Sequence, residues 1–86
     1  MNINDLIAIV KKKLKNEIII ENIKIEDKSF LHVGHKGNDK KKFHLKILIN
    51  SKELSKISRI QSNKKIFKIL DQEIKKYIHS LQILIT

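Results

Sequence analysis

Apolar residues recur along the chain with two different periods, and each period predicts one type of secondary structure. Apolar side chains spaced about four residues apart predict helices over Asn4–Lys15 and Ser58–Tyr77. Alternation of apolar and polar residues predicts strands over Glu21–Ser29, Phe43–Asn50 and Ser80–Ile85. The predicted order of elements is therefore helix, strand, strand, helix, strand.

The second predicted helix is expected to bury one stripe of side chains and to leave most of its lysines in solvent. A short irregular turn over Ser51–Ser55 precedes it, and a loop over Phe30–Lys42 separates the first two strands. That loop contains both glycines of the chain and few apolar anchors, so we expect it to be mobile. The predicted stripe consists of Ile60, Ile66, Phe67, Leu70, Ile74 and Tyr77.

The connections between the strands constrain the topology. The first two strands can pair antiparallel across the long loop, whereas a connection that contains a helix typically joins parallel neighbours. The chain has 86 residues, a length that suits one domain. We therefore predict a single domain over residues 1–86 of the α+β class, with a three-stranded mixed sheet and helices packed on one face.

This topology brings histidines to one end of the sheet. His32 follows the first strand, and His44 and His79 lie where the second and third strands begin. His35 lies in the loop over the same end, and the alternation of the second strand places His44 on the face that is open to solvent. Neutral imidazole is a good ligand for iron, zinc or copper, so these residues form a candidate metal site. The alternative is that they are ordinary solvated side chains.

Composition limits the chemistry further. The chain has no cysteine, so it offers no thiolate nucleophile and cannot hold a cluster with its own sulfurs. A formal net charge of +10 is typical of proteins with anionic partners such as nucleic acid. Of the 19 basic residues, however, only Arg59 is an arginine, the side chain that reads guanine and phosphate with two parallel hydrogen bonds. A lysine-rich composition can also arise from A/T-rich codons.

Lysines of the second predicted helix could nevertheless form a face that contacts phosphates. Lys64, Lys65 and Lys68 are the candidate phosphate contacts of a nucleic-acid-binding face. The alternative is a solvated helix face in a lysine-rich protein.

The sequence gives no sign of membrane insertion or secretion. No apolar run is long enough to cross a bilayer. The first residues also lack the basic start and apolar stretch of a signal peptide. We expect a cytoplasmic protein with no membrane partner.

Three stretches of the chain resemble the BolA family. Ile25–His35 resembles the family's first strand and following loop, and His44–Ile49 resembles its second strand, which opens with His-Phe-Lys or a close variant. Ile78–Leu81 is similar to the Ile-His-Ala-Leu signature at the third strand. The chain departs from the family in its second helix, where Asn63–Lys65 stands in place of an Arg-His-Arg triplet. That departure concerns arginine contacts and leaves the histidines at the sheet end intact.

The resemblance implies a KH-like fold of class II topology and a binding function instead of an enzymatic one. Members of the family pair with monothiol glutaredoxins, and each heterodimer shares a [2Fe–2S] cluster to which glutaredoxin and glutathione supply thiolates. The family's invariant histidine corresponds to His79. The second ligand comes from the loop after the first strand, where His32 is the match and His35 and His44 are alternates. The isolated chain is then expected to be a monomer without a cluster.

Other functions remain open at this point. Some BolA-like proteins are described as transcriptional regulators, which makes DNA the alternative partner of the lysine-rich helix. Gly34–Gly37 matches the G-x-x-G pattern of RNA-binding KH loops, but that loop joins two helices and this one joins two predicted strands. A hydrolase is disfavoured because the chain has no nucleophile motif.

Overall fold

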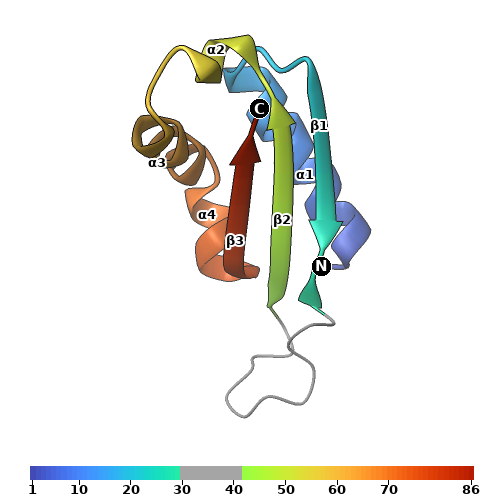
Figure 1. The fold of residues 1–86 in the computed structure, drawn as a ribbon. Coiled ribbons are helices and arrows are strands. Elements are labelled where there is room, and N and C mark those ends of the chain that lie inside the picture. The colour runs from blue at the N-terminus through green and yellow to red at the C-terminus, as the bar shows by residue number, and fades with distance from the viewer. Residues whose placement is uncertain (30–41) are drawn as a thin grey trace.

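The computed structural model describes residues 1–29 and 42–86, and the elements in these ranges follow the predicted order (Figure 1). The strand Phe43–Asn50 has the predicted limits, while the first helix and the last strand are longer than predicted and the first strand is shorter. The expected mobility of Phe30–Lys42 falls almost wholly outside the described residues. The elements are α1 Ile3–Glu17, β1 Asn22–Asp27, β2 Phe43–Asn50, α2 Lys52–Ser55, α3 Arg59–Ile69, α4 Asp71–Lys76 and β3 Ile78–Ile85.

The strands form one mixed sheet in the order β1-β2-β3 (Figure 1). β1 pairs antiparallel with β2, and β3 pairs parallel with β2, as the connections predict. β2 is therefore the central strand. The end of β1 and the beginnings of β2 and β3 meet at the same end of the sheet, which is the lower end in Figure 1.

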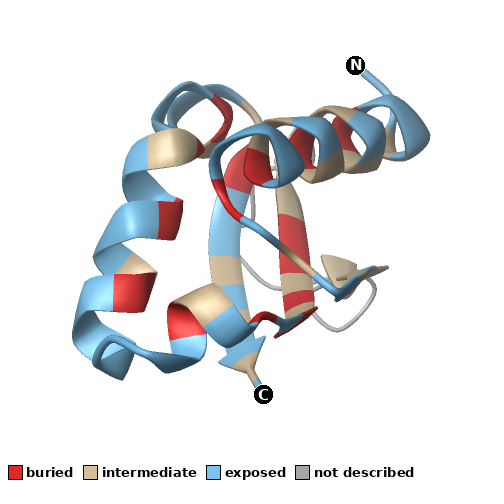
Figure 2. Ribbon diagram, turned by 90° about the horizontal axis from the view of Figure 1, so that it is seen from above, coloured by how far each residue is buried: buried red, intermediate tan, exposed pale blue. Residues whose placement is uncertain are grey.

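The core lies between the sheet and the helices. Alternate residues of β2 are almost fully buried, and α1 has one row of buried apolar residues, Leu6, Val10 and Leu14. Figure 2 shows these buried positions in red along the helix and the strand. Asn2 caps α1, because its side chain accepts a hydrogen bond from the Asp5 N–H at 2.8 Å. The buried apolar residues are Leu6, Val10, Leu14, Ile18, Leu45, Ile47, Ile49, Leu54, Ile66, Leu70 and Ile78.

The predicted helix Ser58–Tyr77 is in fact two helices, and this corrects the sequence prediction. α3 and α4 meet at Leu70, whose φ of −96° and ψ of 15° lie outside the α-helical region. The Leu70 N–H still donates to the Ile66 carbonyl at 3.0 Å, and the Leu70 carbonyl accepts from the Ile74 N–H at 2.9 Å. The chain therefore turns without losing these bonds. No glycine or proline marks the position, so the apolar spacing gave no sign of it.

The buried side of α3 and α4 also differs from the predicted stripe. Ile66 is fully buried as predicted, but Ile60 and Phe67 are 69% and 41% exposed. Two polar residues, Ser62 and Glu73, take buried positions instead. A prediction from apolar residues alone could not include them.

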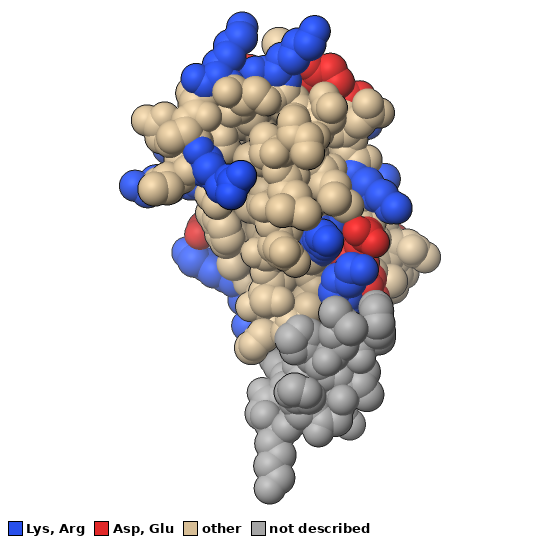
Figure 3. All heavy atoms as spheres, in the orientation of Figure 1, with Lys and Arg blue, Asp and Glu red and all other residues tan. Residues whose placement is uncertain are grey.

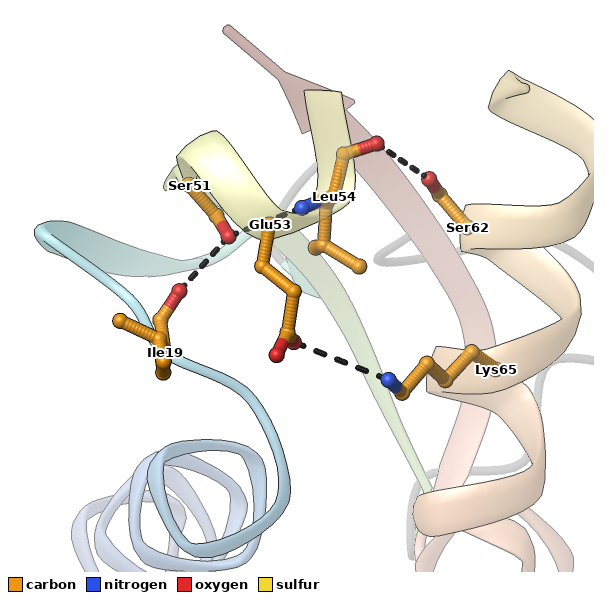
Figure 4. Close-up of polar contacts among 6 residues, drawn as sticks. All are labelled: Ile19, Ser51, Glu53, Leu54, Ser62 and Lys65. Carbon is orange, nitrogen blue, oxygen red and sulfur yellow. Dashed lines mark hydrogen bonds and ion pairs between the residues drawn. The ribbon is translucent and has the colours of Figure 1, made fainter. Parts of the chain in front are cut away.

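A helical turn, α2, replaces the irregular turn predicted over Ser51–Ser55 (Figure 4). The Ser51 hydroxyl caps this turn, accepting from the Leu54 N–H at 3.2 Å and donating to the Ile19 carbonyl at 2.7 Å. The Ser62 hydroxyl of α3 donates to the Leu54 carbonyl at 3.1 Å. These bonds connect α3 to the end of β2 and to the segment before β1.

The helices are amphipathic or short. The longest, α1, has 15 residues and a face rich in lysine. None of the helices within residues 1–29 and 42–86 combines the length and the apolar character that a bilayer crossing requires.

One ion pair joins α1 to α4. The Nζ of Lys13 lies 2.7 Å from Oε2 of Glu73, whose side chain is only 9% exposed. The other carboxylate oxygen is buried and has no hydrogen-bond partner within the described residues. Replacing Lys13 with methionine should lower the free energy of unfolding by about 2 kcal/mol, because it leaves a buried carboxylate without its counter-charge. Urea denaturation measures this change.

Two variants control this prediction. Lys12→Met removes an exposed lysine from the same helix and should change stability by no more than about 0.5 kcal/mol. Adding Glu73→Gln to Lys13→Met removes the unpaired charge and should restore part of the lost stability. If Lys13→Met were as stable as Lys12→Met, the ion pair would contribute nothing to the fold.

Candidate functional site

The end of the sheet at which β2 and β3 begin brings two histidines together. The ring centroids of His44 and His79 are 4.9 Å apart, and the ring planes are inclined by 58°. The strand order predicted that both residues lie at this end. His32 and His35, the other candidate ligands, lie outside the described residues.

His44 is buried, which corrects the expectation that it faces solvent. Its side chain does point away from the helices, but the residue is only 4% exposed, and its Nδ1 lies 2.6 Å from the Ser80 Oγ. Its backbone is also held, because the His44 N–H donates to the Ser29 hydroxyl at 3.0 Å and its carbonyl accepts from the Lys28 N–H at 2.7 Å. The neighbouring strand β3 places Ser80 and His79 against the His44 ring. These contacts exclude solvent from the ring, although it lies on the sheet face opposite the helices.

A register irregularity in β3 produces this arrangement. Phe43 pairs with Ile78 and His44 pairs with Ser80, so His79 is an extra residue on the β3 side. Such an insertion bends a strand locally and redirects the side chains next to it. His79 itself is exposed. The site therefore consists of an accessible imidazole packed on a buried one.

This pair of histidines can supply imidazole nitrogens but is not a complete metal site. Within residues 1–29 and 42–86, no three side chains of His, Cys, Asp or Glu lie close enough together to hold a metal ion. The chain as a whole has no cysteine. A metal group bound at this end of the sheet would need further donors from elsewhere.

Comparison with known proteins gives the family. A family model described as "BolA-like protein" matches residues 14–86, which is most of the chain. The chain belongs to the BolA family. A curated relative, the DNA-binding transcriptional regulator BolA of Haemophilus influenzae, is 29% identical over 73 residues, which cover 85% of this chain and 68% of that protein.

Solved structures of BolA proteins share the fold. The BolA domain of SufE1 from Arabidopsis thaliana has a TM-score of 0.77 and 26% identity, and the match covers 92% of this chain and 87% of that chain. BolA1 from Arabidopsis thaliana has a TM-score of 0.78 at 22% identity, covering 93% of this chain and 88% of that chain. These likenesses confirm the predicted α+β class and the three-stranded mixed sheet.

In this BolA family member, the candidate phosphate contacts lie on the exposed side of α3. Lys64, Lys65 and Lys68 are exposed, and the Lys65 Nζ lies 3.6 Å from Oε2 of Glu53 on α2 (Figure 4). Lys65 and Lys68 line a cleft of about 540 Å³ between α3 and α1, together with Lys13. On the face shown in Figure 3, lysine and arginine side chains lie mostly toward the rim. The cleft between α1 and α3 is thus lined by three lysines and by Glu17, and one of the lysines, Lys13, is paired with Glu73.

Sequence reasoning missed two serines of this candidate site, Ser29 and Ser80. For Ser80 a signal was present, because serine stands where the resembled Ile-His-Ala-Leu signature has alanine. Ser29 follows Asp27, whose Oδ1 accepts the Ser29 N–H at 2.9 Å. This is the local turn that an aspartate forms with the residue two positions later, and it places the Ser29 hydroxyl beside β2.

Proposed function

We propose that this BolA family member is a binding partner of a monothiol glutaredoxin and holds a [2Fe–2S] cluster jointly with it, for cluster assembly or transfer. The observation that carries the proposal is the exposed ring of His79, packed on His44 at the start of an edge strand. Imidazole is a suitable ligand for iron, and histidine in place of thiolate raises the reduction potential of such a cluster. The chain performs no catalytic reaction of its own in this proposal.

The donor atoms divide between the two proteins. Because this chain has no cysteine, the thiolates come from glutaredoxin and glutathione. We assign His79 as one ligand of the remaining iron and His32 as the other, with His35 and His44 as alternates. Burial of His44 against Ser80 supports the assignment of His32, because a buried ring must move before it can bind iron.

Anaerobic mixing of the purified chain with a monothiol glutaredoxin, ferrous iron, sulfide and glutathione tests this function. We expect a coloured heterodimer in size-exclusion chromatography, with an absorption spectrum different from that of the same mixture without this chain. With iron, sulfide and glutathione but no glutaredoxin, the chain should elute as a monomer without cluster absorbance. If all of the colour elutes apart from this chain, the proposed function is wrong.

DNA binding is a second candidate, favoured by the name of the Haemophilus influenzae relative and by the exposed lysines of α3. Any DNA affinity should fall steeply with added salt and depend little on sequence, because lysines contact phosphates as point charges. Replacing Lys64, Lys65 and Lys68 with glutamine should reduce the slope of log K against log salt concentration by about 1 for each lysine that contacts a phosphate. Fluorescence anisotropy of labelled duplexes at several salt concentrations measures this slope.

A matched charge change elsewhere controls the DNA experiment. Glutamine at Lys11, Lys12 and Lys15 of α1 removes the same charge and should leave the slope closer to that of the unmodified protein. Sequence-selective, tight binding at physiological salt would instead favour a transcriptional regulator over the cluster partner proposed above.

A further inference from the structure

His79 is exposed on an edge strand, so its ring direction depends on what it packs against. The ring of His44 lies against it at a centroid distance of 4.9 Å with a tilt of 58°. Tilted ring pairs at this separation are a favourable arrangement of aromatic side chains. The direction of the His79 ring is therefore tied to the direction of the His44 ring.

His44 is held more firmly than His79. Its backbone is bonded to Lys28 and Ser29 at the end of β1, and the residue is almost fully buried. One ring nitrogen, Nδ1, is 2.6 Å from the hydroxyl of Ser80, a short hydrogen bond. This bond holds the direction of the His44 ring, because rotating the ring would move Nδ1 away from the hydroxyl.

The register irregularity explains why Ser80 can make this bond. Because His79 is the extra residue, Ser80 is the in-register partner of His44 on the neighbouring strand. A serine at this position reaches the ring of His44, and an alanine would not.

We infer that Ser80 is a positioning residue: its hydroxyl holds the direction of the His44 ring, and the His44 ring in turn sets the direction of His79. The consequence for cluster binding rests on the proposed function, whereas the positioning itself is a property of the free protein. Hydrogen-bond partners of a metal ligand set its orientation, and their removal typically changes metal affinity by roughly 10–100-fold. Ser80 acts on His79 through the ring of His44, so we expect an effect at the lower end of this range.

The test compares Ser80→Thr with Ser80→Val. These two side chains have nearly the same shape, both suit a strand, and only threonine keeps the hydroxyl. The free proteins are examined by NMR in the same buffer, so that the only difference between them is the side chain at position 80. The readouts are the ¹⁵N shifts of the His44 ring and the proton shifts of the His79 ring.

We expect Ser80→Thr to keep the ring shifts of His44 and His79 close to those of the unmodified protein. Ser80→Val should displace the His44 Nδ1 shift, because the hydrogen bond to that atom is lost, and should also displace the His79 ring protons. If Ser80→Val keeps the shifts of the unmodified protein, or if Ser80→Thr changes them as much as Ser80→Val does, the inference is wrong. Ser80→Ala gives the same comparison if the valine variant fails to fold.

A second measurement tests whether Ser80 also affects cluster binding in the heterocomplex. With glutaredoxin and glutathione, Ser80→Val should lose the cluster on the order of tenfold faster than Ser80→Thr. Equal rates of cluster loss for the two variants would mean that Ser80 does not influence His79 through the ring of His44. If the unmodified protein forms no heterocomplex, the proposed function fails, and the NMR comparison on the free protein still decides the role of Ser80.

Discussion

Replacing His79 with alanine should remove most of the cluster absorbance from the heterocomplex with a monothiol glutaredoxin. His79 lies at the start of β3, where the strand pairing and the ring of His44 fix its position, so no neighbour can easily take its place. His32→Ala should have a milder effect, because His35 and His44 are the alternates for the second ligand. The absorption spectrum and elution volume of the reconstituted mixture measure both effects.

A substitution on the same strand controls this experiment. Gln82 is exposed on β3 and is not among the candidate ligands, so Gln82→Ala should leave the spectrum unchanged. Because His79 is exposed, its loss should change the stability of the free protein by no more than about 0.5 kcal/mol. An unchanged spectrum in the His79→Ala complex would mean that the cluster is held by other groups.

Ile66→Ala should be among the most destabilising single changes in the chain, with a loss of about 2–5 kcal/mol. Ile66 is fully buried in the core and leaves a cavity when truncated. Phe67→Ala removes a larger side chain from the adjacent position, yet it should cost only about 1 kcal/mol, because Phe67 is 41% exposed. Urea denaturation measures both values, provided that the free energy of unfolding falls with urea concentration at the same slope in the two variants. If Phe67→Ala lost more stability than Ile66→Ala, α3 would pack against the core through the side that carries Phe67.

Ile66 and Phe67 show the limit of prediction from apolar spacing, because both belong to the predicted stripe but only Ile66 is buried. The spacing was sufficient to locate a helical region and some of its buried residues. It could not find the true stripe, because Ser62 and Glu73 are buried through polar contacts with the Leu54 carbonyl and with Lys13. Whether a polar residue is buried depends on partners that lie far away in the sequence.

The predicted strand order was enough to give the end of the sheet at which the candidate site lies, but not its detailed geometry. Antiparallel and parallel connections are enough to bring His44 and His79 to one end of the sheet. The register irregularity at His79 and the bond between Ser80 and His44 depend on how two strands fit together, and a single strand carries no sign of this. The strand order therefore predicted that His44 and His79 lie at the same end of the sheet, but not that His44 is buried and His79 exposed. The predicted position of His32 at this end lies outside the described residues.

His44 and His79 lie on strands with different positions in the sheet. β2 is central and bonded on both sides, whereas β3 lies at the edge of the sheet. Local unfolding of an edge strand breaks one ladder of hydrogen bonds, while opening a central strand breaks two, so fluctuations should reach β3 at a lower free energy. The exposed imidazole thus lies on a strand that opens at a lower free energy than the strand that carries His44. In the proposed function, a cluster can be exchanged by a fluctuation of β3 that moves His79 and Ser80 together, while His44 keeps its backbone bonds to Lys28 and Ser29.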